Sequence, residues 1–355
     1  MMKKLRGSCR LLVLLLIFCC LCACENRTQP AAESGGTADS GAVSRDIFAM
    51  DTYMTVTAYG ERAKEAADAA EAEIRRLEAL LSVGDSGSEV YQINHNGSGR
   101  LSEDTAALFK VSGQVYNDTD GAYDITVYPL MKLWGFTGDV QAVPSAEDIA
   151  AAVADSGFSK LTYVDGILTL GKNQGIDFGA IAKGYTGDRI MDIFRQYGVE
   201  SGIVSLGGNV QCHGTKPDGS LWRCGITDPE NPEDTSSLLG IVSVRDKAVI
   251  TSGGYERYFV DDATGAAYHH IMNPHTGYPA DSGLVSVTII SSDGTLADAL
   301  STACFVMGEE NALAYWRANS SRFDMVLMNE DGEIVITEGI EDSFSSGREF
   351  RVEKE

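Results

Sequence analysis

The order in which strand-like and helix-like segments follow one another constrains the fold of this chain most. Residues 50–59 alternate like a strand, and residues 61–81 are rich in Ala, Glu, Arg and Leu with helical spacing. A helix over residues 179–197 then leads into a buried strand at 202–206. Because the segments interleave without a regular βαβ rhythm, the order argues against a Rossmann fold or a TIM barrel. It predicts an α+β fold, a single large mixed-sheet domain with packed helices over residues 45–355.

Turn residues and apolar runs predict further elements. An Asp-Gly pair, Asp165 and Gly166, divides residues 161–170 into a hairpin with a type I′ turn. A second hairpin is expected around Asp331-Gly332. Further strands are expected at residues 241–244, 248–251, 258–260 and 284–291, and helices at residues 296–307 and 309–318.

The first residues have the layout of a secretory signal. Four basic residues precede an uncharged apolar run at residues 11–21, which is too short to span a bilayer as a mature helix. The run ends at Leu21-Cys22-Ala23-Cys24, which resembles a bacterial lipobox. We therefore expect a lipoprotein signal peptide at 1–23, an acylated Cys24, a flexible tether at 24–44, and a lipid anchor on the extracytoplasmic face of a bacterial membrane. An ordinary signal peptide or a short anchor is the alternative.

The charge of the chain limits its ligands. The formal net charge is −23, and the leader holds basic but no acidic residues, so the remainder is more acidic still. Such a chain is not expected to bind nucleic acid. A phosphate-bearing ligand needs a local device here, such as a cation, backbone N–H groups or a placed lysine.

The cysteines do not have the pattern of a disulfide scaffold. Of 8 Cys, only Cys212, Cys224 and Cys304 lie beyond the leader and its lipobox. Cys212 and Cys224 could pair outside the cytoplasm, but no CxxC or Cys/His spacing suggests zinc or a redox couple. We expect all three to be packing residues.

Common nucleotide and hydrolase motifs are missing from the sequence. No G-x-G-x-x-G follows a strand, and residues 179–184 have their lysine one place early for a P-loop. Residues 202–207 do not have the spacing of a G-x-S-x-G nucleophile elbow.

What remains is a series of dense polar and glycine-rich segments. They lie at residues 121–130, 133–136, 176–185 with Asp188, 205–209, 251–255 and 269–279. In their order and spacing, from about Met50 to Gly308, they resemble the ApbE family of FAD:protein FMN transferases. The resemblance implies Mg²⁺-dependent transfer of FMN from FAD to a Ser or Thr hydroxyl of an extracytoplasmic acceptor protein, with release of AMP. Subunits of membrane electron-transfer complexes are the expected acceptors.

A candidate metal site lies at residues 295–302. Asp298 and Thr302 are i and i+4, hence on one helix face, and offer hard oxygen ligands to Mg²⁺. A capping box with Thr295 as N-cap and Asp298 at N3 explains the same residues without a metal. The resemblance favours the metal and implies the Ala180 carbonyl as a third ligand.

Candidate FAD contacts come from several segments. Lys183 is a cation near a helix start, where a phosphate is stabilised, although a lysine there is more often solvated. In the family the matching Asp177 and Lys183 bind FAD. The resemblance implies further cofactor contacts from Met50, Ala122, Tyr123, Asp124 and Ile271. The nearby Tyr128, Trp134 and Phe136 are interpreted as core residues.

The candidate base is a histidine. His269 and His270 are adjacent, and a strand would turn them to opposite faces, so at most one of them points into a given site. A Ser or Thr hydroxyl that attacks phosphorus needs a nearby base, and histidine serves near neutral pH. In the family the second histidine is catalytic, which implies His270 here and leaves His269 structural or exposed.

One departure and two rival functions stay open. Where many members read Ser-Thr-Tyr-Arg, this chain has Ser82-Val83-Gly84-Asp85, so an aromatic that often contacts the flavin is missing. An Mg²⁺-dependent FAD pyrophosphatase needs the same site but uses water as the nucleophile. A non-enzymatic flavin-binding lipoprotein needs no base, so His270 and the Asp298/Thr302 pair argue against it.

Overall fold

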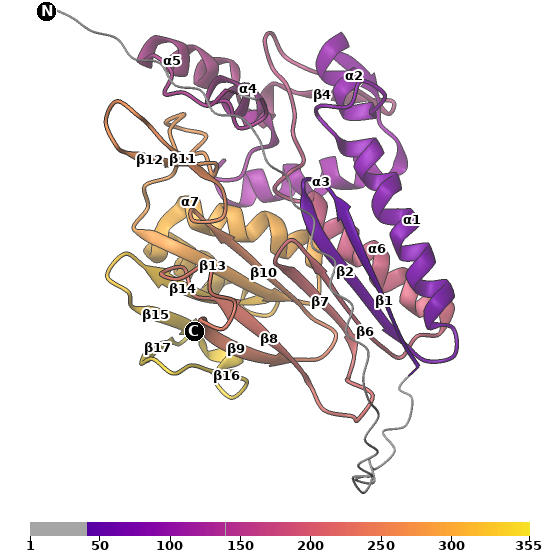
Figure 1. The fold of residues 1–355 in the computed structure, drawn as a ribbon. Helices are drawn as coiled ribbons and strands as arrows, with labels where there is room; N and C mark the ends of the chain where they lie inside the picture. The colour runs from indigo at the N-terminus through magenta and orange to yellow at the C-terminus, as the bar shows by residue number, and fades with distance from the viewer. Residues whose placement is uncertain (1–40, 139) are drawn as a thin grey trace, which may run out of the picture. The chain divides into compact units, whose positions relative to one another are not determined.

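The structure is a computed structural model that describes residues 41–138 and 140–355. The predicted signal peptide, Cys24 and most of the predicted tether lie outside the described residues. The predicted α+β class is confirmed: a nine-stranded sheet is covered by helices (Figure 1). Neighbouring strands are antiparallel except the last pair, which is parallel. In spatial order the strands are β1 (Ala42–Ala49), β2 (Thr52–Tyr59), β6 (Ser201–Leu206), β7 (Asn209–Gly214), β10 (Ala248–Gly253), β13 (Leu284–Ser291), β14 (Phe323–Asn329), β15 (Ile334–Thr337) and β17 (Phe350–Glu353).

In the middle of this sheet both faces are buried, and successive side chains of a strand point to opposite sides. In β14, Met325 and Leu327 pack toward the helices, whereas Val326 and Met328 pack against a second, three-stranded sheet. That sheet is ordered β16 (Phe344–Ser345), β9 (Leu238–Val244) and β8 (Trp222–Thr227). Smaller sheets are formed by β3 (Ser98–Arg100), β5 (Ile167–Thr169) and β4 (Thr162–Val164), and by β11 (Tyr258–Val260) with β12 (Ala267–His269).

Seven α-helices are described, and their order is that of the chain. They are α1 (Ala63–Leu81), α2 (Glu89–Asn96), α3 (Glu103–Asp118), α4 (Tyr128–Leu133), α5 (Ala146–Asp155), α6 (Ala182–Tyr197) and α7 (Gly294–Asn319). Helices α1, α6 and α7 pack on the main sheet, and α3 packs on α7 (Figure 1). None of the helices in the described part of the chain has the length and apolar character needed to cross a membrane.

Helices α6 and α7 approach each other closely, and this contact positions the site below. Asp188 of α6 accepts hydrogen bonds from the backbone N–H groups of Gly294 and Thr295 at the start of α7, at 3.0 and 2.7 Å. A Cβ atom on Gly184 would lie 2.1 Å from the Gly294 carbonyl oxygen and 2.6 Å from Cβ of Asp298. Only glycine therefore fits at position 184.

Most predicted elements are confirmed, with shifted ends. Both predicted hairpins form, and Asp165 and Gly166 have the positive φ values, 52° and 78°, of a type I′ turn. The predicted pair of C-terminal helices is one element, α7, interrupted at Gly308, where φ is 78°. Helix α6 begins at Ala182 instead of residue 179, because residues 179–181 form a turn.

Two predictions near the start of the described chain were wrong: the end of the tether and the start of the first strand. Strand β1 begins at Ala42, so the last residues of the predicted tether (24–44) are sheet. Residues 50 and 51, predicted as strand, form a two-residue turn between β1 and β2. Met50 and Asp51 have φ values of 50° and 58°, which cost a residue with a side chain about 1–2 kcal/mol. Glu78 of α1 stabilises the turn by accepting a hydrogen bond from the Met50 N–H at 2.7 Å.

Candidate active site

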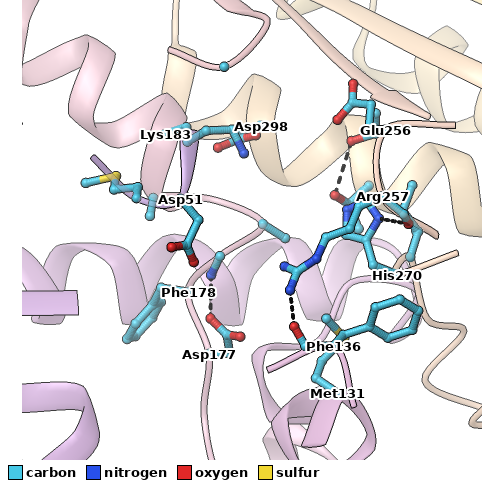
Figure 2. A pocket seen from close by; sticks show the side chains of 18 of the residues that line it. Asp51, Met131, Phe136, Asp177, Phe178, Lys183, Glu256, Arg257, His270 and Asp298 are labelled. Carbon is cyan, nitrogen blue, oxygen red and sulfur yellow. Dashed lines mark hydrogen bonds between the residues drawn. The ribbon is translucent and has the colours of Figure 1, made fainter. Parts of the chain in front are cut away.

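A cavity of about 1100 Å³ brings the predicted site residues together (Figure 2). Every residue predicted to be catalytic, cofactor-binding or metal-binding lines it. They are Met50, Ala122, Tyr123, Asp124, Asp177, Ala180, Lys183, His270, Ile271, Asp298 and Thr302. Because these residues come from separate strands, turns and helices, the tertiary fold and not local sequence assembles them. Cys24 lies outside the described residues.

Asp298 is a buried carboxylate held in place by two donors. Its side chain is 4% exposed. Its Oδ2 accepts from the Gly184 backbone N–H at 2.8 Å, and its Oδ1 accepts from Asn209 Nδ2 at 2.9 Å. Each carboxylate oxygen retains a second lone pair for a ligand.

The capping explanation for Asp298 is wrong. The N-cap of α7 is Asp293, whose side chain accepts from the Leu296 N–H at 2.8 Å. Thr295 instead donates its hydroxyl to Asp188. Asp298 therefore lies inside α7, past its first turn, and has no capping role.

The other predicted metal ligands line the same cavity. In a continuing helix the Gly184 N–H would donate to the Ala180 carbonyl, but it donates to Asp298. The Thr302 hydroxyl lies 3.4 Å from that of Ser252. Within the described residues no group of three or more His, Cys, Asp or Glu side chains could hold a metal. The predicted donor set consists of one carboxylate, one hydroxyl and one carbonyl.

Two cations face the cavity. Lys183, at the start of α6, and Arg257, which follows β10, both line it (Figure 2). Arg257 donates from its guanidinium to the Phe136 carbonyl. Within residues 41–138 and 140–355 neither side chain forms an ion pair, although most other arginines do. Both charges are thus available to an anionic ligand.

Asp177 lines the same cavity as these cations. Its Oδ1 accepts from the Gly179 N–H at 2.8 Å. Burial raises the pKa of the Asp177 carboxyl, while the Gly179 N–H, Arg257 and Lys183 act to lower it. Glu256 precedes Arg257 in the sequence and is exposed, yet desolvation by the cavity wall raises the pKa of its carboxyl to about 7.

The two adjacent histidines have different surroundings. His269 uses both ring nitrogens: Nε2 lies 3.0 Å from the Ala280 carbonyl, and Nδ1 accepts from the Ile271 N–H at 3.2 Å. His270 has its Nδ1 3.1 Å from the Arg257 carbonyl. A carbonyl only accepts, so Nδ1 carries the proton and Nε2 presents a lone pair. Desolvation lowers the pKa of His270 to about 4, so the ring is neutral at neutral pH.

The predicted flavin segment is buried and internally hydrogen-bonded. Tyr123 is buried, and its hydroxyl lies 3.4 Å from that of Ser112. The Asp124 carboxylate accepts from the Thr126 N–H and hydroxyl, at 2.8 and 2.7 Å, and from the Phe158 N–H at 3.2 Å. These internal bonds fix the segment, and a contact of the Asp124 side chain with the flavin stays a prediction.

Several lining residues were not predicted. Asp51, Phe178, Glu256 and Arg257 line the cavity, and Phe136, predicted as core, is both fully buried and part of the wall. Trp134 is core as predicted, whereas Tyr128 is only half-buried. Residues 82–84, where the family's aromatic is missing, also line the cavity. Arg257 could have been found from its place two residues after the glycine-rich segment 251–255.

Comparisons with known proteins agree on one family. The protein-family model described as "ApbE family" matches residues 50–327 of this chain. A FAD:protein FMN transferase of Klebsiella pneumoniae is 35% identical over 273 residues, covering 74% of this chain and 82% of the relative. One from Treponema pallidum is 32% identical over 339 residues, covering 88% and 90%. The crystal structure of the ApbE protein of Thermotoga maritima superimposes with a TM-score of 0.79 at 34% identity, covering 87% of this chain and all of that one. The Pseudomonas stutzeri flavinyl transferase ApbE gives 0.76 at 31% identity, covering 86% and 98%.

Proposed function

We infer that this chain, which belongs to the ApbE family, is an FAD:protein FMN transferase: it takes FMN from FAD and attaches it to an acceptor protein. The observation that carries this conclusion for the chain's own residues is the cavity. All the residues that the family resemblance implied for FAD, metal and base line one space of about 1100 Å³, which lies slightly above the usual size range of small-molecule pockets.

We propose Mg²⁺ as the metal. Asp298, Thr302 and the Ala180 carbonyl are oxygen donors of the kind that Mg²⁺ prefers, and a site with few protein ligands suits an ion that keeps waters and substrate phosphates. When bound, Mg²⁺ neutralises charge on the pyrophosphate of FAD.

Lys183 and Arg257 are proposed to bind the pyrophosphate. In a chain with a net charge of −23, an anion approaches against the field of the protein. Two cations that have no ion-pair partner among the described residues offset that field locally, and a guanidinium matches the geometry of two phosphate oxygens.

His270 is proposed as the general base. The bare Nε2 takes the proton of an acceptor Ser or Thr hydroxyl while the hydroxyl oxygen bonds to the phosphorus on the FMN side of FAD. The bond from that phosphorus to the oxygen of AMP breaks, and AMP leaves. The product carries FMN through a phosphoester to the acceptor side chain.

We propose further that the enzyme is a lipid-anchored, extracytoplasmic protein whose acceptors belong to membrane electron-transfer complexes. The support is in the sequence, where an apolar run ends at a lipobox-like Cys24.

The test is incubation of the full chain with FAD, MgCl₂ and an acceptor domain, followed by intact-mass measurement of the acceptor and quantification of AMP. A gain of one FMN on the acceptor, matched by AMP, supports the transferase. AMP formed at the same rate with and without acceptor, and no mass gain, identifies a pyrophosphatase and rejects the proposal.

A further inference from the structure

Two buried thiols lie side by side where the nine-stranded sheet packs against the sheet of β16, β9 and β8. Cys212 of β7 and Cys224 of β8 are 2% and 3% exposed, and their Sγ atoms are 3.6 Å apart. Both thiols are free in this structure. Cys304, the third described cysteine, is also buried and free, and it packs in a different cluster.

We propose that Cys212 and Cys224 form a disulfide when the folded chain meets an oxidising disulfide. A disulfide needs a sulfur–sulfur distance of about 2.0 Å, so the two side chains must move together by only about 1.6 Å. The linked residues are close in sequence and opposite each other around the turn at residues 215–221, where the Lys216 N–H donates to the Ser220 carbonyl at 2.9 Å. The bond therefore closes a short loop without changing the fold.

Access to the thiols is provided by β8. It is an edge strand, paired with β9 alone, so it can open locally without disturbing the nine-stranded sheet. Cys224 lies on the strand that opens, and hydrogen bonding from Cys212 lowers the pKa of its thiol, so Cys224 is the attacking sulfur. Its thiolate attacks an external disulfide and releases one thiol. Cys212 then displaces the second thiol from the mixed disulfide. Two cysteine thiols are oxidised, and one external disulfide is reduced to two thiols, which take up the two protons.

The bond would tie two parts of the active site together. On the helix-facing side of β7, Asn209 donates to Asp298 and Gln211 donates to the Gly184 carbonyl at 3.0 Å. Next to Cys224 in β8, Gly225 and Thr227 line the cavity. A Cys212–Cys224 bond thus links the cavity wall formed by β8 to the strand that holds the proposed metal ligand.

The experiment treats the detergent-solubilised full chain with glutathione disulfide, in urea below the unfolding transition so that β8 opens. Free thiols are then alkylated after denaturation and mapped by peptide mass spectrometry. We expect a peptide pair joined through Cys212 and Cys224, with Cys304 alkylated. Alkylation of both Cys212 and Cys224, or glutathione on either as the final product, would overturn the proposal.

A second measurement does not depend on the mapping. The oxidised protein should melt about 5 °C higher than the reduced protein, the usual scale for a short-loop disulfide in a domain of this size. The double variant Cys212→Ser/Cys224→Ser should show no such shift, whereas Cys304→Ser should show it in full. An equal shift in the double variant would also overturn the proposal. Transfer activity under reducing conditions is measured in parallel, because its loss would bear on the proposed function and not on the disulfide.

Discussion

Replacing His270 by alanine should separate catalysis from stability. The variant loses a single side-chain hydrogen bond, from Nδ1 to the Arg257 carbonyl, so unfolding should become easier by only about 0.5–1.5 kcal/mol. The same change removes the bare Nε2, and loss of a general base lowers rates by about 10²–10⁴. FAD binding should stay within a few-fold, because the base acts on the acceptor hydroxyl.

His269→Ala is the matched control. It removes two bonds, to the Ala280 carbonyl and from the Ile271 N–H, together with an edge-on contact of the ring with Phe305. Stability should therefore fall by about 1–3 kcal/mol, more than for His270→Ala, while the folded fraction keeps most of its activity. Thermal unfolding, FAD titration and acceptor flavinylation are measured on both variants. Equal rate losses, or a His270 variant that does not bind FAD, would refute the assignment of the base.

The pH dependence of kcat/KM tests the protonation state of the same ring. Because the pKa of His270 is lowered to about 4, the neutral, proton-accepting form is complete above about pH 5 in the free enzyme. We expect kcat/KM to lose activity only as the pH falls toward 4. The pKa of Glu256 is raised to about 7, so any step near pH 7 should vanish in Glu256→Gln. An ascending limb near pH 6.5 that persists in Glu256→Gln would contradict the desolvated ring.

Four further substitutions test the rest of the site and the anchor. Asp298→Asn should abolish Mg²⁺ binding together with turnover, and it should lower the free energy of unfolding by about 1–3 kcal/mol because a buried N–H donor loses its acceptor. Mg²⁺-induced thermal stabilisation that survives the substitution would speak against a metal ligand. Lys183→Met and Arg257→Met should each weaken FAD binding about tenfold and make the affinity less dependent on salt. Both effects are measured by flavin fluorescence titration. Unchanged affinity would show that the cations serve another purpose. Cys24→Ser should release an active soluble protein in cell fractionation, and a variant that stays in the membrane fraction would disprove the anchor.

Long apolar or strongly periodic segments could be predicted from the sequence because their own pattern determines their state. Helix α1 buries alanines, Ile74 and Leu77 along one face, and the two hairpins carry their turn residues. Strand β7 was missed because its buried positions include polar Asn209 and Gln211. Those side chains are buried because they bond to Asp298 and Gly184, and such a reason appears only when α6, α7 and the sheet are together.

The candidate site was predictable where a motif carried it, and not where tertiary contacts alone did. Lys183 lies in a dense motif, whereas Arg257 reaches the cavity through its contact with Phe136, which is 121 residues away in sequence. Likewise, because His269 and His270 are adjacent, the sequence predicted only that their side chains point to opposite faces. Which of the two has a free nitrogen depends on the carbonyls of Arg257 and Ala280, and sequence spacing does not specify those neighbours.

Asp298 illustrates why local sequence cannot separate a structural role from a functional one. The pattern Thr295-x-x-Asp298 satisfies a capping box, and nothing within it reveals that Asp293 already caps α7. With the cap supplied elsewhere, the chain still buries the Asp298 carboxylate and directs two donors to it. Burying a charge costs free energy that two hydrogen bonds offset only in part. A hydrophobic residue would fill the same space at a lower cost in free energy, so the carboxylate at position 298 is better explained by the proposed metal ion than by the stability of the helix.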